Sequence, residues 1–183
     1  KLAGAYAGER LADLTLARVE VKLGDPAVAD RLLTALLARN PDDIDALNVA
    51  AAHRLKAAEN EKDPQKATAL RAEARAFAGR AYKLDPNHYQ TLIVYAQGRE
   101  GMPGYPTDND LEVLRDALDL APQVDVLRLK TAEALLKKDK LAEAARVLRP
   151  LALDPHGGEV VEAARAVLTL IETQAARSPA PAG

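Results

Sequence analysis

The chain has 183 residues, which is enough for one domain with a substantial core. Hydrophobic residues make up 48% of the chain and aromatic residues only 3%, so the core has to be built from Leu, Val, Ile and Ala, which suits closely packed helices. Acidic and basic residues are interleaved, with a formal net charge of -2, so no basic face indicates nucleic-acid binding. No apolar stretch is long enough for a membrane span, and the absence of cysteine removes disulfides and thiolate metal sites.

Four apolar segments with helical character each end just before a proline. These prolines are Pro41, Pro86, Pro122 and Pro155, and they lie 45, 36 and 33 residues apart. A proline cannot continue a helix, so each one predicts a turn between two helices. Two of the three spacings are close to a period of about 34 residues, which indicates an internal repeat.

The first repeat unit is predicted over about residues 10–43. We expect a helix around Ala17, a turn at Gly24 and Asp25, and a second helix that opens at Ala29. Small residues in this order allow the two helices of the unit to pack closely.

The second unit, about residues 44–88, is longer than the others, and its surplus lies around residues 57–72. Asp63 is a good N-cap and Pro64 suits the first helical position, so we expect both helices to be about two turns longer than normal and to project from the repeat. A partly disordered charged loop is the alternative. The Ala-rich segment 66–83 favours the lengthened helices.

The third unit, about residues 89–124, contains an unusual loop between its two helices. This loop carries Met102, the single methionine of the chain, and Tyr105 between proline residues. The first interpretation is a long loop that packs back onto neighbouring helices, with Thr107 or Asp108 as the cap of the second helix. The alternative is a contact loop for a partner.

The last unit and the end of the chain continue the pattern. In residues 125–157 the small positions are Ala132 and Ala144, which correspond to those of the first unit. Apolar residues then recur at helical spacing over 159–176, which predicts a capping helix with one face on the last repeat. Residues 177–183 are rich in Pro and Ala and are expected to be a flexible tail.

From about Leu11 to Pro155 the chain resembles tetratricopeptide repeat (TPR) proteins, on the proline spacing and the small residues described above. The resemblance implies an all-α fold in one domain over residues 1–176. This fold would be a right-handed α-solenoid of about four TPR-like helix pairs plus a C-terminal capping helix. The large aromatic residue that often opens the first helix of a TPR is replaced by Asp13 in the first unit and by Arg128 in the last.

No set of acid, base, nucleophile or metal ligands stands out in the sequence, so we expect no catalytic residue, no metal site and no cofactor. His53, His88 and His156 lack metal-ligand spacing among themselves and with nearby carboxylates. We interpret all three as ordinary surface or turn residues.

The resemblance also implies a binding surface, because the first helices of successive TPR pairs line a concave groove. Apolar residues such as Val21 and Ile93 among charged ones suit an amphipathic helix or an extended apolar segment of a partner. The alternative is that a flanking segment of the same protein fills the groove. The polar residues expected to line the groove are Arg18, Lys22, Asn48, Lys56, Gln90, Gln97, Glu133 and Lys137.

We therefore interpret the chain as a protein–protein interaction scaffold that binds a peptide or helix of a protein partner and has no catalytic activity. The alternative is a substrate-recruiting or regulatory domain of a larger enzyme, for example a peptidase or transferase. The start at Lys1 within a helical pattern favours a fragment of a longer chain. Its Ala, Arg and Leu usage is typical of a bacterial protein, and cytoplasm and periplasm are both compatible with it. The sequence does not indicate an oligomeric state.

Overall fold

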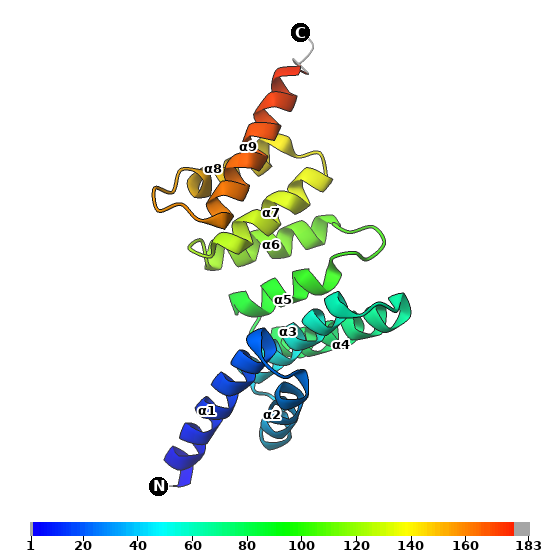
Figure 1. Cartoon of the computed structure of the whole chain (residues 1–183), viewed down its shortest axis with the longest axis vertical. Helices are drawn as coiled ribbons and strands as arrows, with labels where there is room; N and C mark the ends of the chain where they lie inside the picture. The colour runs from blue at the N-terminus through cyan, green and yellow to red at the C-terminus, as the bar shows by residue number, and fades with distance from the viewer. Residues whose placement is uncertain (1, 178–183) are drawn as a thin grey trace. The chain divides into compact units, whose positions relative to one another are not determined.

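The computed structural model describes the backbone of residues 2–177 and the side chains of residues 9–173. Within residues 2–177 the chain forms nine α-helices and no strand (Figure 1), which confirms the predicted all-α fold. The tail predicted after the last helix lies, from residue 178 on, outside the described residues.

The helices fall into two compact units, one up to residue 102 and one from residue 103 onward. The first unit contains five helices and the second contains four. In chain order they are α1 (Leu2–Leu23), α2 (Pro26–Arg39), α3 (Ile44–Asn60), α4 (Pro64–Leu84), α5 (Tyr89–Arg99), α6 (Asp108–Leu120), α7 (Asp125–Lys137), α8 (Leu141–Ala152) and α9 (Glu159–Arg177).

Helices α1 and α2 form the first predicted pair. Ala17 and Ala29 are fully buried, and the lack of bulk at both positions lets the two helices approach closely. The turn between them is set by Asp25, whose carboxylate accepts the backbone N–H of Ala27 at 2.8 Å while Pro26 takes the first helical position. The predicted turn is confirmed, and the helix starts at Pro26, three residues before the predicted start at Ala29.

Helices α3 and α4 form the second pair and run side by side in Figure 1. The segment that joins them is short, and Asp63 caps α4 by accepting the N–H of Gln65 at 2.8 Å. Lengthened helices are therefore correct and the charged loop is not. The extension is uneven, because α3 is only about one turn longer than α7 whereas α4 is more than two turns longer than α8.

A partly buried ion pair ties α1 to the start of α3. Asp43 caps α3 by accepting the N–H of Ala46, and its side chain is only 2% exposed. The guanidinium of Arg10 donates to both carboxylate oxygens of Asp43 at 2.6 Å. Burial by itself would raise the pKa of Asp43, but the hydrogen bonds from Arg10 and Ala46 outweigh burial and hold this pKa below its usual value. The carboxylate therefore stays ionised inside the fold.

The interpretation of His53 as a surface or turn residue is wrong. His53 lies in the middle of α3 and is only 5% exposed, with Nε2 at 3.4 Å from Oδ1 of Asp30 on α2. Arg54 binds the same oxygen of Asp30 at 2.8 Å. Burial lowers the pKa of His53, and the positive charges of Arg54 and Lys56 lower it further, whereas Asp30 raises it. The other two histidines, His88 and His156, lie at turns as expected.

His53 predicts a pH dependence of stability. Its pKa is lower in the fold than the ordinary value of 6.5, so the unfolded chain binds the proton more readily. The stability that neutral His53 contributes is complete above pH 6.5 and is lost as the pH falls through the folded-state pKa. Urea unfolding at about pH 7.5 and about pH 5.5 should show a larger loss for the wild type than for His53→Gln. Equal losses in the two proteins would contradict this assignment.

The second unit contains the last predicted pair and the capping helix. Ala132 on α7 and Ala144 on α8 are buried, as expected for the small positions of a repeat. On α9 the buried residues Val161, Ala164 and Ile171 form one face, and this helix packs on α8 and α7. The predicted apolar face of the last helix is confirmed.

Charged side chains hold the two positions where a large aromatic residue often opens a TPR. Asp13 on α1 accepts a hydrogen bond from Arg39 on α2 at 3.3 Å. Arg128 on α7 donates to the carbonyl oxygen of Pro122 at 3.1 Å and to that of Val147 on α8 at 3.4 Å. In these two helix pairs, hydrogen bonds are made at the position where an aromatic side chain would otherwise pack.

The loop that contains Met102 and Tyr105 packs back on neighbouring helices, as the first interpretation expected. Both side chains are half-buried. In the first unit, Arg75 contacts Sδ of Met102 at 3.5 Å, and in the second unit the ammonium of Lys137 lies 5.2 Å from the ring centroid of Tyr105. Thr107 is the cap of α6, in a capping box with Asp110.

Candidate functional site

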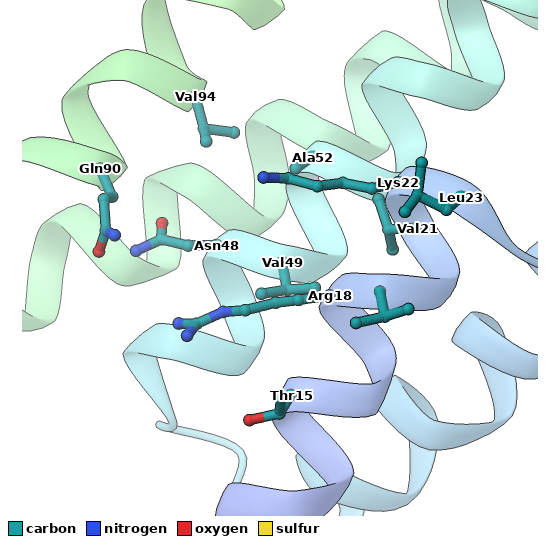
Figure 2. Close-up of a pocket in the computed structure, with 11 residues that line it drawn as sticks. Thr15, Arg18, Val21, Lys22, Leu23, Asn48, Val49, Ala52, Gln90 and Val94 are labelled. Carbon is teal, nitrogen blue, oxygen red and sulfur yellow. The ribbon is translucent and has the colours of Figure 1, made fainter. Parts of the chain in front are cut away.

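The first unit contains an open cleft of about 480 Å³ (Figure 2), a volume in the range typical of ligand sites. Three helices contribute to it, namely α1, α3 and α5, which are the first helices of the successive predicted pairs. Helix α3 packs against both of the others, so the three expose neighbouring faces. The lining residues are Thr15, Arg18, Val19, Val21, Lys22, Leu23, Asn48, Val49, Ala52, Gln90 and Val94.

The wall of the cleft is mainly apolar, and part of it is open to solvent. Val21 and Val94 are buried, whereas Val19 is 48% exposed and Leu23 is 88% exposed. These two exposed side chains belong to the last turns of α1, whose opposite face packs on α2 and α3. Exposed apolar side chains that adjoin a cleft are typical of an interaction site.

The mouth of the cleft carries positive charge. In Figure 2 the side chains of Arg18 and Lys22 extend from α1 across the face of α3. Arg18 makes an exposed ion pair with Asp45 at 3.2 Å. The ammonium group of Lys22 has no hydrogen-bond or ion-pair partner among the described residues. Lys22 is therefore available to a negatively charged ligand.

Lys56, another predicted groove residue, acts on the backbone beside the cleft. Its ammonium donates to the carbonyl oxygens of Val21 at 2.8 Å and of Lys22 at 2.7 Å, which are among the last carbonyls of α1. A cation at this end of a helix satisfies unpaired carbonyl groups and interacts favourably with the helix dipole. Lys56 thus fixes the end of α1 at the cleft but does not line the cleft.

The floor of the cleft contains a polar group without a partner. Asn48 is only 7% exposed, and its Nδ2 donates to Oγ1 of Thr91 at 2.9 Å and lies 3.3 Å from Nδ1 of His88. Its Oδ1 is buried and accepts no hydrogen bond from any described residue. Leaving a buried acceptor unpaired costs about 1–3 kcal/mol, so this oxygen is an uncommon feature of a folded core.

The structure brings together four of the predicted groove residues and leaves the other four apart from the cleft. Arg18, Lys22, Asn48 and Gln90 line it. Lys56 stands beside it, and Gln97 is half-buried further along α5 and does not line it. Glu133 and Lys137 lie on α7 in the second unit, so their role in binding stays a prediction.

The sequence analysis expected Val21 in the groove, and Val21 lines the cleft, whereas Ile93, also expected there, does not. It missed most of the other apolar lining residues. Val19, Leu23, Ala52 and Val94 line the cleft, and none of them was expected there. A signal was present for two of them, since Val19 and Leu23 follow Arg18 and Lys22 directly on α1. The buried state of Asn48 had no such signal.

Neither a metal site nor a membrane span is found in the described part of the chain. Among the described residues, no group of three or more His, Cys, Asp or Glu side chains is arranged to hold a metal ion. None of the helices within residues 2–177 combines the length and the apolar character needed to cross a membrane.

Comparison with solved structures establishes the fold. No protein-family model matches the sequence, and a search of curated proteins gives no significant match. The chain is similar to the crystal structure of a thermophilic TPR protein from Thermus thermophilus, with a TM-score of 0.75 and 19% sequence identity. The similarity covers 87% of this chain and 81% of the other. The fold is therefore that of a TPR protein, an α-solenoid of helix pairs.

Proposed function

We propose that this chain, which has the fold of a TPR protein, binds a peptide or helix of a partner protein in the cleft between α1, α3 and α5 and performs no catalysis of its own. The TPR fold supports a protein-interaction scaffold in general. The observation that supports this particular surface is the cleft itself, which combines apolar walls, a cationic mouth and a buried unpaired acceptor. Such a combination is typical of polypeptide recognition and offers no nucleophile or general base.

The lining of the cleft also supports a binding role over a catalytic one. The titratable side chains that line it are Arg18 and Lys22, and both are exposed. Catalytic acids and bases usually have pKa values shifted by burial or by a charged partner. His53, whose pKa is lowered, is buried between helices and does not line the cleft.

Photocrosslinking tests the proposed surface. A photoreactive benzoylphenylalanine replaces Thr15, which is exposed at the cleft, and in a separate bait it replaces Ala72, which is exposed on α4 and does not line the cleft. In the source cell, the Thr15 bait should crosslink a protein that the Ala72 bait does not. The substitution Ala52→Trp in the Thr15 bait should abolish this crosslink, because the indole fills the cleft.

The same experiment has an outcome that contradicts the proposal. Crosslinks that are equal at Thr15 and Ala72, or that survive Ala52→Trp in a bait with unchanged circular dichroism, would place the interaction elsewhere on the chain.

A further inference from the structure

We propose that the first unit contains a proton-sensitive latch between α2 and α4. While His53 is neutral, Arg54 joins the two helices by binding Asp30 on α2 and Glu73 on α4. Protonated His53 takes Asp30 from Arg54, and the link between α2 and α4 is lost. None of these four residues lines the binding cleft, so the latch does not depend on the proposed function.

Arg54, on α3, makes the bridge between α2 and α4. Its Nη1 donates to Oδ1 of Asp30 at 2.8 Å, and its Nε donates to Oε2 of Glu73 at 2.7 Å. Both α2 and α4 pack on α3, so one guanidinium restrains the two helices at once. The side chain of Arg54 is 24% exposed and both carboxylates are half exposed, so each bond by itself is weak. The bridge can therefore break while all three helices stay folded.

His53 competes with Arg54 for the same carboxylate oxygen. Nε2 of His53 lies 3.4 Å from Oδ1 of Asp30, the oxygen that Arg54 binds. A neutral imidazole has one N–H donor, whereas an imidazolium has two and a positive charge. The ring is only 5% exposed, so its charged form needs a carboxylate close by. Arg54 reaches solvent and also has Glu73, so it is the group that gives up Asp30.

The surroundings of His53 decide when the latch opens. Burial has the largest effect on its pKa and lowers it from 6.5. The carboxylate of Asp30 raises this pKa, and the charges of Arg54 and Lys56 lower it, while Glu73 on α4 acts through Arg54. Neither α1 nor α5, which also pack on α3, supplies a charged group with a comparable effect. The ring is therefore neutral and the latch closed at neutral pH.

Phe77 on α4 lies where opening of the latch changes the packing. A narrow pocket of about 40 Å³ between α2, α3 and α4 is lined by both His53 and Phe77. Phe77 is half-buried and packs against two apolar clusters, one formed by α1, α2 and α3 and the other by α3, α4 and α5. Without the bridge, α4 is free to move away from α2, and one side of the phenyl ring becomes exposed.

Fluorine NMR of the full chain tests the latch, because Phe77 is the single phenylalanine of the sequence. Labelling with fluorophenylalanine therefore gives one signal, and a soluble gadolinium chelate measures the exposure of the ring through the relaxation rate of that signal. Between about pH 7.5 and about pH 5, this rate should rise about twofold or more in the wild type. The midpoint should coincide with the titration of the imidazole NMR signals of His53.

Three variants identify the parts of the latch. His53→Gln should keep the low relaxation rate over the whole pH range. Asp30→Ala and Arg54→Met should show the high rate already at neutral pH, since both lack the bond that joins α2 to Arg54. Arg31→Met is the matched control and should titrate as the wild type does. Arg31 is exposed beside Asp30 on α2 and has no ion pair among the described residues.

Several results would overturn the latch. They are an imidazole of His53 that stays neutral down to about pH 5, an unchanged relaxation rate after it has titrated, and a low rate in Arg54→Met at neutral pH. A loss of helical circular dichroism that accompanies the rise in rate would show acid unfolding in place of a latch. Asp30→Ala and Arg54→Met change partly exposed side chains, so their test stands even where His53→Gln fails to fold.

Discussion

Arg10→Met is expected to lower the free energy of unfolding by about 3 kcal/mol. The substitution leaves the carboxylate of Asp43, whose side chain is 2% exposed, without the guanidinium that now binds both of its oxygens. Methionine keeps most of the length and the apolar stem of arginine. The loss of unfolding free energy therefore measures the contribution of the positive charge and its hydrogen bonds. Urea unfolding at neutral pH measures the difference.

Arg18→Met is the matched control on the same helix. Arg18 also pairs with an aspartate of α3, but both side chains of this pair are more than a third exposed, at 44% for Arg18 and 36% for Asp45. An exposed ion pair contributes about 0–1 kcal/mol, so this variant should be close to the wild type. A loss for Arg10→Met that is no larger than the loss for Arg18→Met would show that Asp43 is not held in a partly buried ion pair.

Ala144→Leu should destabilise the second unit by about 1–3 kcal/mol. Ala144 is fully buried on α8, which packs against α7 and α9, and a larger side chain forces these helices apart. Alanine and leucine are both good helix formers, so the cost comes from packing and not from helix propensity.

Ala142→Leu provides the control for this prediction. It places the same side chain two residues earlier on α8, where Ala142 is exposed, and should change the stability by less than about 0.5 kcal/mol. Thermal melting of the two variants compares them directly. Equal melting temperatures would mean that the repeat register assigned to the second unit is wrong.

The helices were predictable because their ends are set by local chemistry. Asp25 with Pro26, and Asp63 with Pro64, combine an N-cap with a residue suited to the first helical position, and a helix starts at each pair. The four prolines that close the segments supplied the repeat period. The alanines that become fully buried at helix crossings, such as Ala17 and Ala144, followed from that period.

The candidate site was predictable only in part, because it depends on contacts between distant segments. Register placed Arg18, Lys22, Asn48 and Gln90 on the first helices of successive pairs, and the structure brings these four together. Residues whose role depends on contacts with a distant part of the chain could not be predicted from the repeat register. The bond between Arg10 and Asp43 joins residues 33 positions apart, and no local pattern marks it.

His53 shows why burial was hard to predict on α3. This helix packs against α1, α2, α4 and α5, so most of its circumference is covered. Its periodicity therefore does not separate a buried face from an exposed one, and a histidine in an alanine-rich helix resembles a surface residue. The same covering on several sides buries Asn48 and leaves its oxygen unpaired.

Methyl NMR is the measurement that tests the binding cleft most directly. The full chain is labelled at its valine methyl groups and titrated with the partner segment that crosslinks at Thr15, prepared as a peptide. Binding in the cleft predicts shifts at Val19, Val49 and Val94, which line it, and none at Val147 on α8. Shifts at Val147 with unchanged signals from the three cleft valines would contradict the proposed surface.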